Sequence, residues 1–511
     1  MELRWTAGEA DVRCPVCGRL QGQELLATAG VPWRDEPAEI VRCGGCGCVV
    51  ISTVRPPSVY SDADWDLYVE QIAGIEAIAL MLSKVGAPRG ARMLDVGCGY
   101  GFGLDLAQVI FGWDGIGLEP SLAAERGRLD LGLDIRAGTL DDAFEPDEHF
   151  DVIFASEVLE HVPDPRDFLA SVIRRLSDDG VFLMTTPDGS IVHPDTPMTA
   201  LYPALSIGAH EFLLTRDGLR DMLHDAGFEA NVWAEGVTLV ALAARSTDAL
   251  RATRPRANVT TRDLIRYCET RGAAARPGSP LAVGMGSRRM KFAVSGNEFE
   301  LAKAALPQLR SAVMDRYGVD LDDPSTTLAV ADRHPVLVVV HYFVGIFELV
   351  QERDPQMAAA HFAAAGAVGR AQYEKHGFYP DPETPTLEFL ALGHLALALA
   401  QFDPDGVPDA LAQMDETVAH GAGDAESAAD YRARAEGEVI ARQTVAGTNR
   451  VKARAVAARV YRRLSRVRVP GVARAARGAR GVLVRGSATP GRPSSGRPAS
   501  GEARGVDSAS G

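Results

Sequence analysis

Residues 93–103 read Met-Leu-Asp-Val-Gly-Cys-Gly-Tyr-Gly-Phe-Gly, and this stretch decides the fold. The apolar residues up to Val96 predict a short buried strand, and residues 104–110 predict a helix after a glycine-rich turn. The three glycines allow a tight turn and leave no Cβ between the backbone and a ligand. A helix that begins at such a turn presents free N–H groups, which favour an anionic ligand group. The stretch therefore predicts a ligand site in an α/β domain.

Two acidic residues flank this turn. Asp95 lies in the first strand, and Glu119 ends a second predicted strand, residues 112–118. Ligands of open α/β sheets bind beyond the carboxyl ends of the strands, and a carboxylate about 20 residues after the turn suits bonding to two ribose hydroxyls. Surface carboxylates without a ligand are the alternative, but two such residues at strand ends favour the nucleoside site.

These stretches resemble class I S-adenosylmethionine (SAM)-dependent methyltransferases. The turn, together with Gly-Leu-Glu-Pro-Ser at 117–121, is similar to the first motif and the next acidic strand end of that family. Residues 150–165 are similar to its fourth-strand motif, and residues 177–187 to its fifth-strand turn. The resemblance covers residues 60–246 and implies methyl transfer from SAM.

Alternating strand and helix signals in the same region predict a Rossmann-like, doubly wound parallel sheet with helices on both faces. The expected strands are 92–96, 114–118, 133–136, 151–155, 180–186, 229–234 and 237–244.

The resemblance also implies which residues hold SAM. The glycines would admit the methionine part, Glu119 would hold the ribose, and Thr139 and Leu140 would flank the adenine. Cys98 is expected to be an inert filler, although a helix N-terminus can lower the pKa of a thiol. The full set of expected cofactor-binding residues is Asp95, Gly97, Cys98, Gly99, Gly101, Glu119, Pro120, Thr139, Leu140 and Ser156.

Three residues are candidates for a base that removes a proton from the acceptor. His210 is the first, because it follows a proline-bearing segment, 187–209, that is expected to form a loop over the acceptor pocket. His161 and Glu157 follow the fourth strand. A structural hydrogen bond is the alternative role for either histidine.

The first 52 residues carry five of the seven cysteines. Cys14 and Cys17 form one Cys-x-x-Cys-Gly unit, and Cys43 and Cys46 form another. Four thiolates at this spacing predict a structural Zn²⁺ site in a zinc ribbon, with redox-active or incidental thiols as the alternative. Cys48 is the spare thiol: it could compete for a ligand place, but its alternation with Val49, Val50 and Ile51 predicts a strand residue. Similar ribbons precede methyltransferase domains that act on sugars or natural products, and this arrangement resembles them.

The chain of 511 residues is long enough for about three domains. We expect a zinc ribbon at 1–52, the methyltransferase domain at 53–246, with one amphipathic helix at 65–85, and a linker at 247–284 with a short helix at 262–270. An all-α domain follows at 285–445, loosely resembling tetratricopeptide repeats, and then a basic, largely disordered tail at 446–511. The expected helices of the all-α domain are 295–317, 335–353, 355–375, 384–402, 407–420 and 424–445.

The function expected from these features is methyl transfer to a hydroxyl of a small molecule or saccharide. The net charge of −15 argues against nucleic acid as a partner. A nucleic-acid methyltransferase and a non-catalytic adaptor are nevertheless the two alternatives. Residues 285–445 could bind a protein partner, or could form a helical bundle that only stabilises the enzyme. The basic tail could contact an anionic membrane surface. Without a signal pattern or a long apolar run, a cytoplasmic and at most membrane-peripheral location is expected.

Overall fold

A small antiparallel sheet opens the chain. The computed structural model describes residues 3–31, 36–52, 62–71, 74–253, 259–379, 381 and 383–446. The strands of this first sheet follow the order β1-β2-β3-β4-β10 and comprise β1 (Leu3–Ala10), β2 (Gln23–Ala29), β3 (Ala38–Cys43), β4 (Val49–Ser52) and β10 (Phe212–Leu213). β10 lies far along the chain, so the cysteine-bearing sheet is completed by a strand from the region 53–246.

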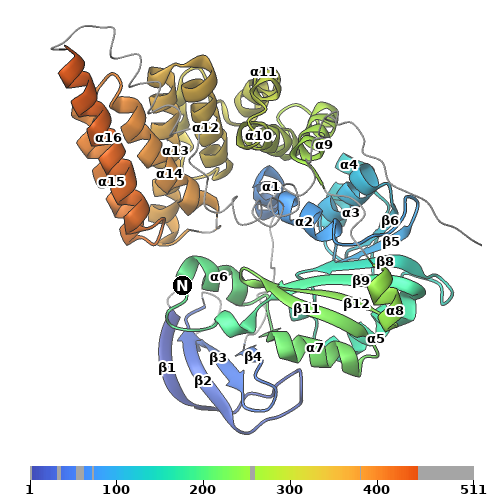
Figure 1. Ribbon diagram of the computed structural model, residues 1–511. Helices are drawn as coiled ribbons and strands as arrows, with labels where there is room; N and C mark the ends of the chain where they lie inside the picture. The colour runs from blue at the N-terminus through green and yellow to red at the C-terminus, as the bar shows by residue number, and fades with distance from the viewer. Residues whose placement is uncertain are drawn as a thin grey trace, which may run out of the picture. The chain divides into compact units, whose positions relative to one another are not determined.

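The second sheet has seven strands in the order β11-β12-β9-β8-β5-β6-β7 (Figure 1). The strands are β5 (Arg92–Val96), β6 (Asp114–Leu118), β7 (Ile135–Arg136), β8 (Phe150–Ser156), β9 (Leu176–Pro187), β11 (Glu229–Glu235) and β12 (Thr238–Ala244). All seven expected strands are present. The sheet is mixed rather than wholly parallel, because β12 pairs antiparallel with both β9 and β11.

Helices cover both faces of this sheet, as expected of a doubly wound fold. Figure 1 shows α3 and α4 on one side and α5 and α7 on the other. The helices and helical turns of this region are α1 (Asp62–Gln71), α2 (Ile75–Leu82), α3 (Phe102–Leu106), η1 (Ala107–Phe111), α4 (Ala123–Leu131), η2 (Leu159–His161), α5 (Pro165–Arg175), η3 (Gly189–Ile191), α6 (Met198–Leu205), α7 (Arg216–Asp225) and α8 (Thr247–Ala252). The single helix expected at 65–85 is therefore two helices, α1 and α2.

Helices occupy the chain from Thr261 onwards. They are α9 (Thr261–Ala274), α10 (Pro280–Ser295), α11 (Phe299–Tyr317), η4 (Pro324–Ala329), α12 (Val336–Phe347), η5 (Glu348–Glu352), α13 (Pro355–His376), α14 (Glu383–Leu399), η6 (Pro404–Gly406), α15 (Val407–Ala419) and α16 (Ala425–Ala446). All six expected helices have counterparts here, and the tetratricopeptide likeness stays a prediction. Among the described residues, none of these helices combines the length and the apolarity needed to cross a membrane.

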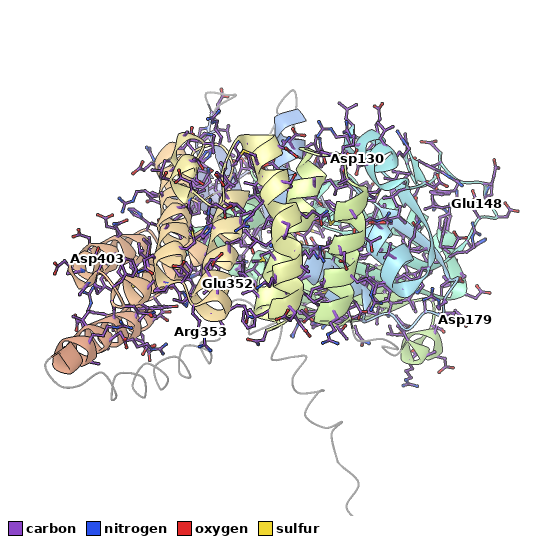
Figure 2. The ribbon with its side chains drawn as sticks, turned by 90° about the horizontal axis from the view of Figure 1, so that it is seen from above. Asp130, Glu148, Asp179, Glu352, Arg353 and Asp403 are labelled. Carbon is purple, nitrogen blue, oxygen red and sulfur yellow. The ribbon has the colours of Figure 1, made fainter. Side chains whose placement is uncertain are left out.

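The linker expected at 247–284 is corrected. Thr260 begins α9 with a reciprocal capping box to Asp263, and α10 starts inside the expected linker. Both helices bury side chains and pack against each other. The basic tail, and with it the expected membrane contact, lies outside the described residues. Acidic side chains stand at the surface of both halves of the described chain, among them Asp179, Glu148 and Asp403 (Figure 2).

The apolar core runs without a break from the first sheet into the second. One cluster joins Cys14, Cys43 and Val50 of the cysteine-bearing sheet to Leu94 and Phe182 of the central strands. A smaller cluster joins the outer face of the first sheet to α6 and β10 through Ile40, Ile51, Leu201, Leu205 and Leu213. The first sheet therefore packs directly against the segment that follows β9.

Candidate functional site

The glycine turn joins β5 to α3 at the carboxyl edge of the central sheet. Gly97, Gly99 and Gly101 have φ values of 66°, 54° and 93°, a region that other residues rarely adopt. A Cβ at Gly97 would lie 2.6 Å from Val158 Cγ2, and one at Gly101 would lie 2.5 Å from Leu133 Cδ1. Both the backbone angles and the space therefore require glycine at 97 and 101.

Glu119 organises the turn from the neighbouring strand end. Its Oε2 accepts a hydrogen bond from Gly99 N at 2.9 Å, and its Oε1 accepts one from Ser121 N at 2.8 Å. Each carboxylate oxygen has a second lone pair, so the same group can still accept ribose hydroxyls. Glu119 is therefore brought to the glycine turn as the sequence predicts.

Asp95 acts from beneath the turn. It is buried, and its carboxylate accepts a hydrogen bond from the N–H of Leu104 in the first turn of α3. Gly101, at the N-cap of α3, has no side chain to do this. Burial raises the pKa of Asp95 to about 8, and the charge of Glu119 adds to the rise. Asp95 therefore holds the first turn of α3 against the end of β5.

This burial predicts a pH-dependent stability. Because the folded pKa of about 8 lies above the ordinary value of 3.8, folding takes up a proton and stability falls as pH rises between these values. Asp95→Asn keeps the acceptor oxygen and removes the titration. We expect its melting temperature to exceed that of the wild type by a margin that grows from about pH 5 to about pH 8. Equal melting curves of the two ligand-free proteins at the higher pH would contradict this.

The other expected cofactor residues divide into buried or half-buried residues and exposed residues. Cys98 is half-buried beside Asp95 and Glu119, and burial with these two charges raises the pKa of its thiol, as expected of an inert residue. Ser156 Oγ lies 2.8 Å from Thr185 Oγ1. Leu140 belongs to the buried core. The exposed members are Pro120 and Thr139, which donates to Asp142 Oδ2 at 2.6 Å.

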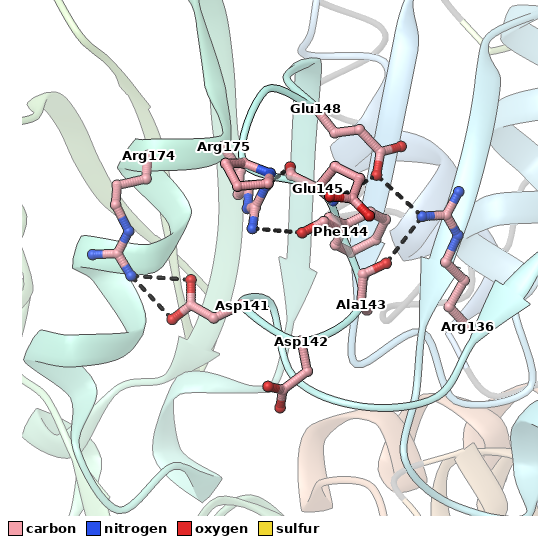
Figure 3. A pocket seen from close by; sticks show the side chains of 10 residues that line it. Arg136, Asp141, Asp142, Ala143, Phe144, Glu145, Glu148, Arg174 and Arg175 are labelled. Atoms are coloured by element: carbon pink, nitrogen blue, oxygen red, sulfur yellow. Dashed lines mark hydrogen bonds and ion pairs between the residues drawn. The ribbon is translucent and has the colours of Figure 1, made fainter.

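A pocket of about 570 Å³ lies beside the loop that follows β7 (Figure 3). Its arginines are engaged with the loop itself. Arg174 Nη2 donates to both oxygens of Asp141 at 3.1 and 3.0 Å, and Arg136 Nη1 lies 3.4 Å from Glu148 Oε2. Arg175 Nη2 donates to the carbonyl of Phe144 at 3.0 Å. These arginines hold the loop 141–148. The loop directly follows Thr139 and Leu140, which are expected to flank the adenine.

Glu157 follows β8 in a conformation that costs energy. Its φ is 57°, unusual for a residue with a side chain, and such strain clusters at functional sites. Its backbone N donates to the carbonyl of Thr185 at 3.0 Å, and its Oε1 accepts from Thr185 Oγ1 at 2.9 Å. Solvent reaches the side chain, yet the surrounding protein desolvates the carboxylate and raises its pKa to about 7. Glu157 is thus a solvent-accessible carboxylate poised near neutrality.

Glu160, His161 and His210 meet behind Glu157. The imidazole rings of His161 and His210 have centroids 4.6 Å apart, and His210 Nε2 is 3.9 Å from Glu160 Oε1. Ligand atoms of the three residues lie within 4.8 Å of one another, so the group could hold a cation. No sequence pattern assigned a role to Glu160, because its full burial comes from contacts across the fold.

His210 is less accessible than its place in the sequence suggested. It is buried, and Nδ1 lies 2.7 Å from the carbonyl of Ala204, so that nitrogen carries the proton. Burial and the neighbouring His161 lower the pKa of His210 to about 4. His161 Nδ1 lies 2.9 Å from the carbonyl of Ala209 in the same way. Both histidines therefore anchor the segment that leads to β10.

This segment includes residues 187–209, which were expected to form a loop. It contains η3 and α6 instead, with Pro203 inside α6. Arg42 Nη2 of β3 donates to the carbonyl of Val192 at 3.1 Å, and β10 pairs with β4. The sheet that carries the cysteines therefore supports the segment that precedes β10.

The four predicted metal ligands converge. The Sγ atoms of Cys14, Cys17, Cys43 and Cys46 lie within 4.8 Å of one another. The glycines that follow the two pairs, Gly18 and Gly47, have φ values of 74° and 72°, as the tight turns require. Gly45 N donates to Cys43 Sγ at 3.4 Å, a bond that favours a thiolate. The donor set and its turns fit a tetrahedral Zn²⁺.

Cys48 lies closer to this cluster than the sequence suggested. Its Sγ is 3.3 Å from both Cys14 Sγ and Cys46 Sγ, and the residue directly precedes β4. It is fully buried.

Comparison with known proteins places the chain in a family. A family model described as a methyltransferase domain matches residues 69–232. A probable S-adenosylmethionine-dependent methyltransferase of Mycolicibacterium smegmatis is 34% identical over 27% of this chain and 52% of its own length. A ubiquinone biosynthesis O-methyltransferase of Ruegeria sp. (strain TM1040) is 30% identical over 34% of this chain and 73% of its own.

A solved structure adds a distant likeness. Phosphoethanolamine N-methyltransferase 2 of Haemonchus contortus, in complex with SAM, is 20% identical, with a TM-score of 0.30, over 36% of this chain and 47% of that one. The chain spans about half, or less, of the curated relatives matched first, at 52% and 40% of their lengths. The match to the methyltransferase model and to the Ruegeria enzyme, on top of the glycine turn and its two carboxylates, shows that this chain belongs to the class I SAM-dependent methyltransferases.

Proposed function

We propose that the protein transfers the methyl group of SAM to a hydroxyl of a small molecule or saccharide. The observation that carries the proposal is the convergence of Glu119 and the glycine turn at one sheet edge, with Glu157 directly after the adjoining strand β8. The O-methyltransferase names of several relatives support a hydroxyl acceptor. The net negative charge of the chain supports an acceptor other than a nucleic acid, whose phosphate backbone it would repel.

In the proposed reaction, the acceptor oxygen attacks the methyl carbon of SAM in line with the bond to sulfur. The new bond is O–CH₃, the broken bond is CH₃–S⁺, and S-adenosylhomocysteine leaves. The acceptor proton passes to the carboxylate of Glu157, which Thr185 Oγ1 orients at 2.9 Å. His210, His161 and Glu160 shape the acceptor side. This assignment moves the base from His210, favoured by the sequence, to Glu157, because His210 is buried and its Nδ1 is committed to Ala204.

Calorimetry with SAM, followed by mass spectrometry of labelled product, tests the function. The protein is incubated with SAM labelled in the methyl group and with two acceptor panels, hydroxylated aromatic compounds and nucleotide sugars. We expect micromolar SAM binding and label in a hydroxyl-bearing product. An intact protein that does not bind SAM would refute the proposal.

Glu157 gives a pH-dependent prediction. With a pKa of about 7, the base form accumulates as pH rises, so kcat/KM should climb through this value and level off above it. Glu157→Gln should lower kcat about 100-fold to 10,000-fold and flatten this limb.

The matched control for Glu157 is Glu160→Gln. Burial and the charge of Glu157 raise the pKa of Glu160 well above its usual range, so its carboxyl stays protonated and glutamine imitates it. The rising limb should survive in this variant. A rising limb that persists in Glu157→Gln would assign the base elsewhere.

We also propose that Cys14, Cys17, Cys43 and Cys46 bind a structural Zn²⁺. The grouping of four thiols on two glycine-bearing turns supports this. The closed four-sulfur set leaves no position for a substrate, so the metal stabilises the sheet and takes no part in methyl transfer.

A further inference from the structure

Ion pairs connect the helices that flank the glycine turn to helices α9, α10 and α11. The sequence suggested two roles for the helical region, a docking surface or a stabilising bundle, and it placed α9 in the linker as a short helix at 262–270. The contacts of the described residues point elsewhere. Each of the three helices places a cation against an acidic residue of α1, α2 or α3.

The contact from α9 reaches the helix of the glycine turn itself. Asp105 lies on α3, four residues after Gly101, and its side chain is fully buried. Arg271 Nε donates to Asp105 Oδ2 at 2.8 Å, a second guanidinium nitrogen bonds to Oδ1, and Tyr267 Oη donates to Oδ2 at 2.6 Å. The N-terminus of α3 is where Asp95 and the turn meet. A displacement of Asp105 would therefore move the backbone that faces the cofactor.

The contacts from α10 and α11 hold the two helices that precede β5. Arg316 of α11 binds Asp66 through Nη2 at 3.1 Å and also pairs with the buried Glu70 on the same helix, α1. Arg288 Nε of α10 donates to the carbonyl of Gln71 at 2.8 Å, and Lys291 of α10 pairs with Glu76 of α2. These cations lie at the boundary between the two regions, where screening by water is weak.

The braced helix α1 in turn contacts the glycine turn. The Tyr68 ring of α1 lies 6.0 Å from the ring of Phe102, and the Phe102 ring lies 4.9 Å from that of Tyr100 inside the turn. Tyr100 Oη donates to Asp130 at 2.7 Å on α4. Ring contacts therefore link the turn to α1, and the cations that hold α1 come from residues beyond 260.

We propose that α9–α11 form part of the cofactor site, with Arg271 as a positioning residue that fixes the glycine-turn helix for SAM. This inference rests on the proposed function. It assigns the α9–α11 part of the helical region to SAM affinity rather than to stability alone. Because Asp105 is fully buried, loss of Arg271 leaves a carboxylate without its cation, and the helix must shift or the group must take up a proton.

The test compares SAM affinity in matched variants of the full chain. Arg271→Gln should raise the Kd and the KM for SAM about tenfold or more, with a smaller change in kcat at saturating SAM. Asp105→Asn combined with Arg271→Gln leaves a neutral amide pair and should recover most of the affinity. Arg271→Lys, which keeps a cation, should fall between the two. Tyr267→Phe removes one hydrogen bond and should weaken SAM binding less.

The control is another ion pair on the same helix. Arg262 Nε bonds to Glu298 Oε1 at 2.8 Å, in an exposed pair, and Arg262→Gln should leave the Kd unchanged. All affinities are measured well below each melting temperature. A lower melting temperature for Arg271→Gln and Tyr267→Phe with unchanged Kd and KM would overturn the inference and leave a stabilising role. Failure of the wild type to bind SAM would instead refute the proposed function and, with it, this inference.

Discussion

Glu119→Ala is expected to weaken SAM binding by about a hundredfold or more. Two effects add in this variant. The ribose loses an ionised acceptor for its hydroxyls, and hydrogen bonds to charged groups contribute about 1.5–3 kcal/mol each. The turn also loses its brace, because Gly99 N and Ser121 N both donate to this carboxylate. Calorimetric titration with SAM measures the change.

Glu125→Ala is the matched control, since this glutamate lies exposed on the first turn of α4, shortly after Glu119 in the chain. It should bind SAM as the wild type does. Wild-type affinity in a folded Glu119→Ala protein would place the ribose elsewhere and would leave the carboxylate a purely structural brace.

Cys17→Ala or Cys43→Ala is expected to remove the zinc and to destabilise more than the first sheet. Binding of zinc by four thiolates contributes about 10 kcal/mol or more in small zinc domains. The thiol-bearing turns share a core with central strands, and Ile40 and Ile51 pack with Leu201 and Leu205 of α6. Metal loss should therefore loosen the acceptor-side segment, lower the melting temperature and reduce kcat more than SAM affinity.

Elemental analysis of the purified protein, with melting curves before and after chelation, checks this. Cys98→Ala removes a thiol outside the cluster and should keep one zinc per chain. Cys48→Ala should also keep the metal, since the other four thiols complete a tetrahedral set. The metal site would be contradicted if the purified protein contained no zinc and if neither the chelator nor Cys17→Ala changed its melting temperature.

The sequence predicted the central sheet well, because its signals are local. The central strands β5 and β6 are short, largely apolar runs followed by Gly97 and Glu119, so residues 92–96 and 114–118 were assigned with the bounds that the structure shows. The glycine turn and Glu119 were found because their chemistry depends on residue type and spacing. The four cysteines were predicted for the same reason.

The sequence did not predict features that depend on contacts between residues far apart in the chain. Helix α10 carries Arg288, Arg289 and Lys291 in buried positions, whereas the sequence predicted no helix between residues 271 and 294. Arg288 and Lys291 pair with Glu383 and Glu76, which lie far away in the chain. No local sequence pattern predicts these pairs. Although burial opposes it, Arg288 and Lys291 lower the pKa of Glu383 to about 2. Similarly, two residues of β10 gave no strand signal, because their partner is β4.

The pairing of β10 with β4 limits how this enzyme can be re-engineered. A chimera that exchanges residues 188–213 for those of a relative would leave an unmatched strand edge on the cysteine-bearing sheet. A truncation that starts after residue 52 would strip α6 of the apolar surface it covers. An exchange of residues 188–213 that aims at a new acceptor therefore has to include residues 1–52 of the same relative.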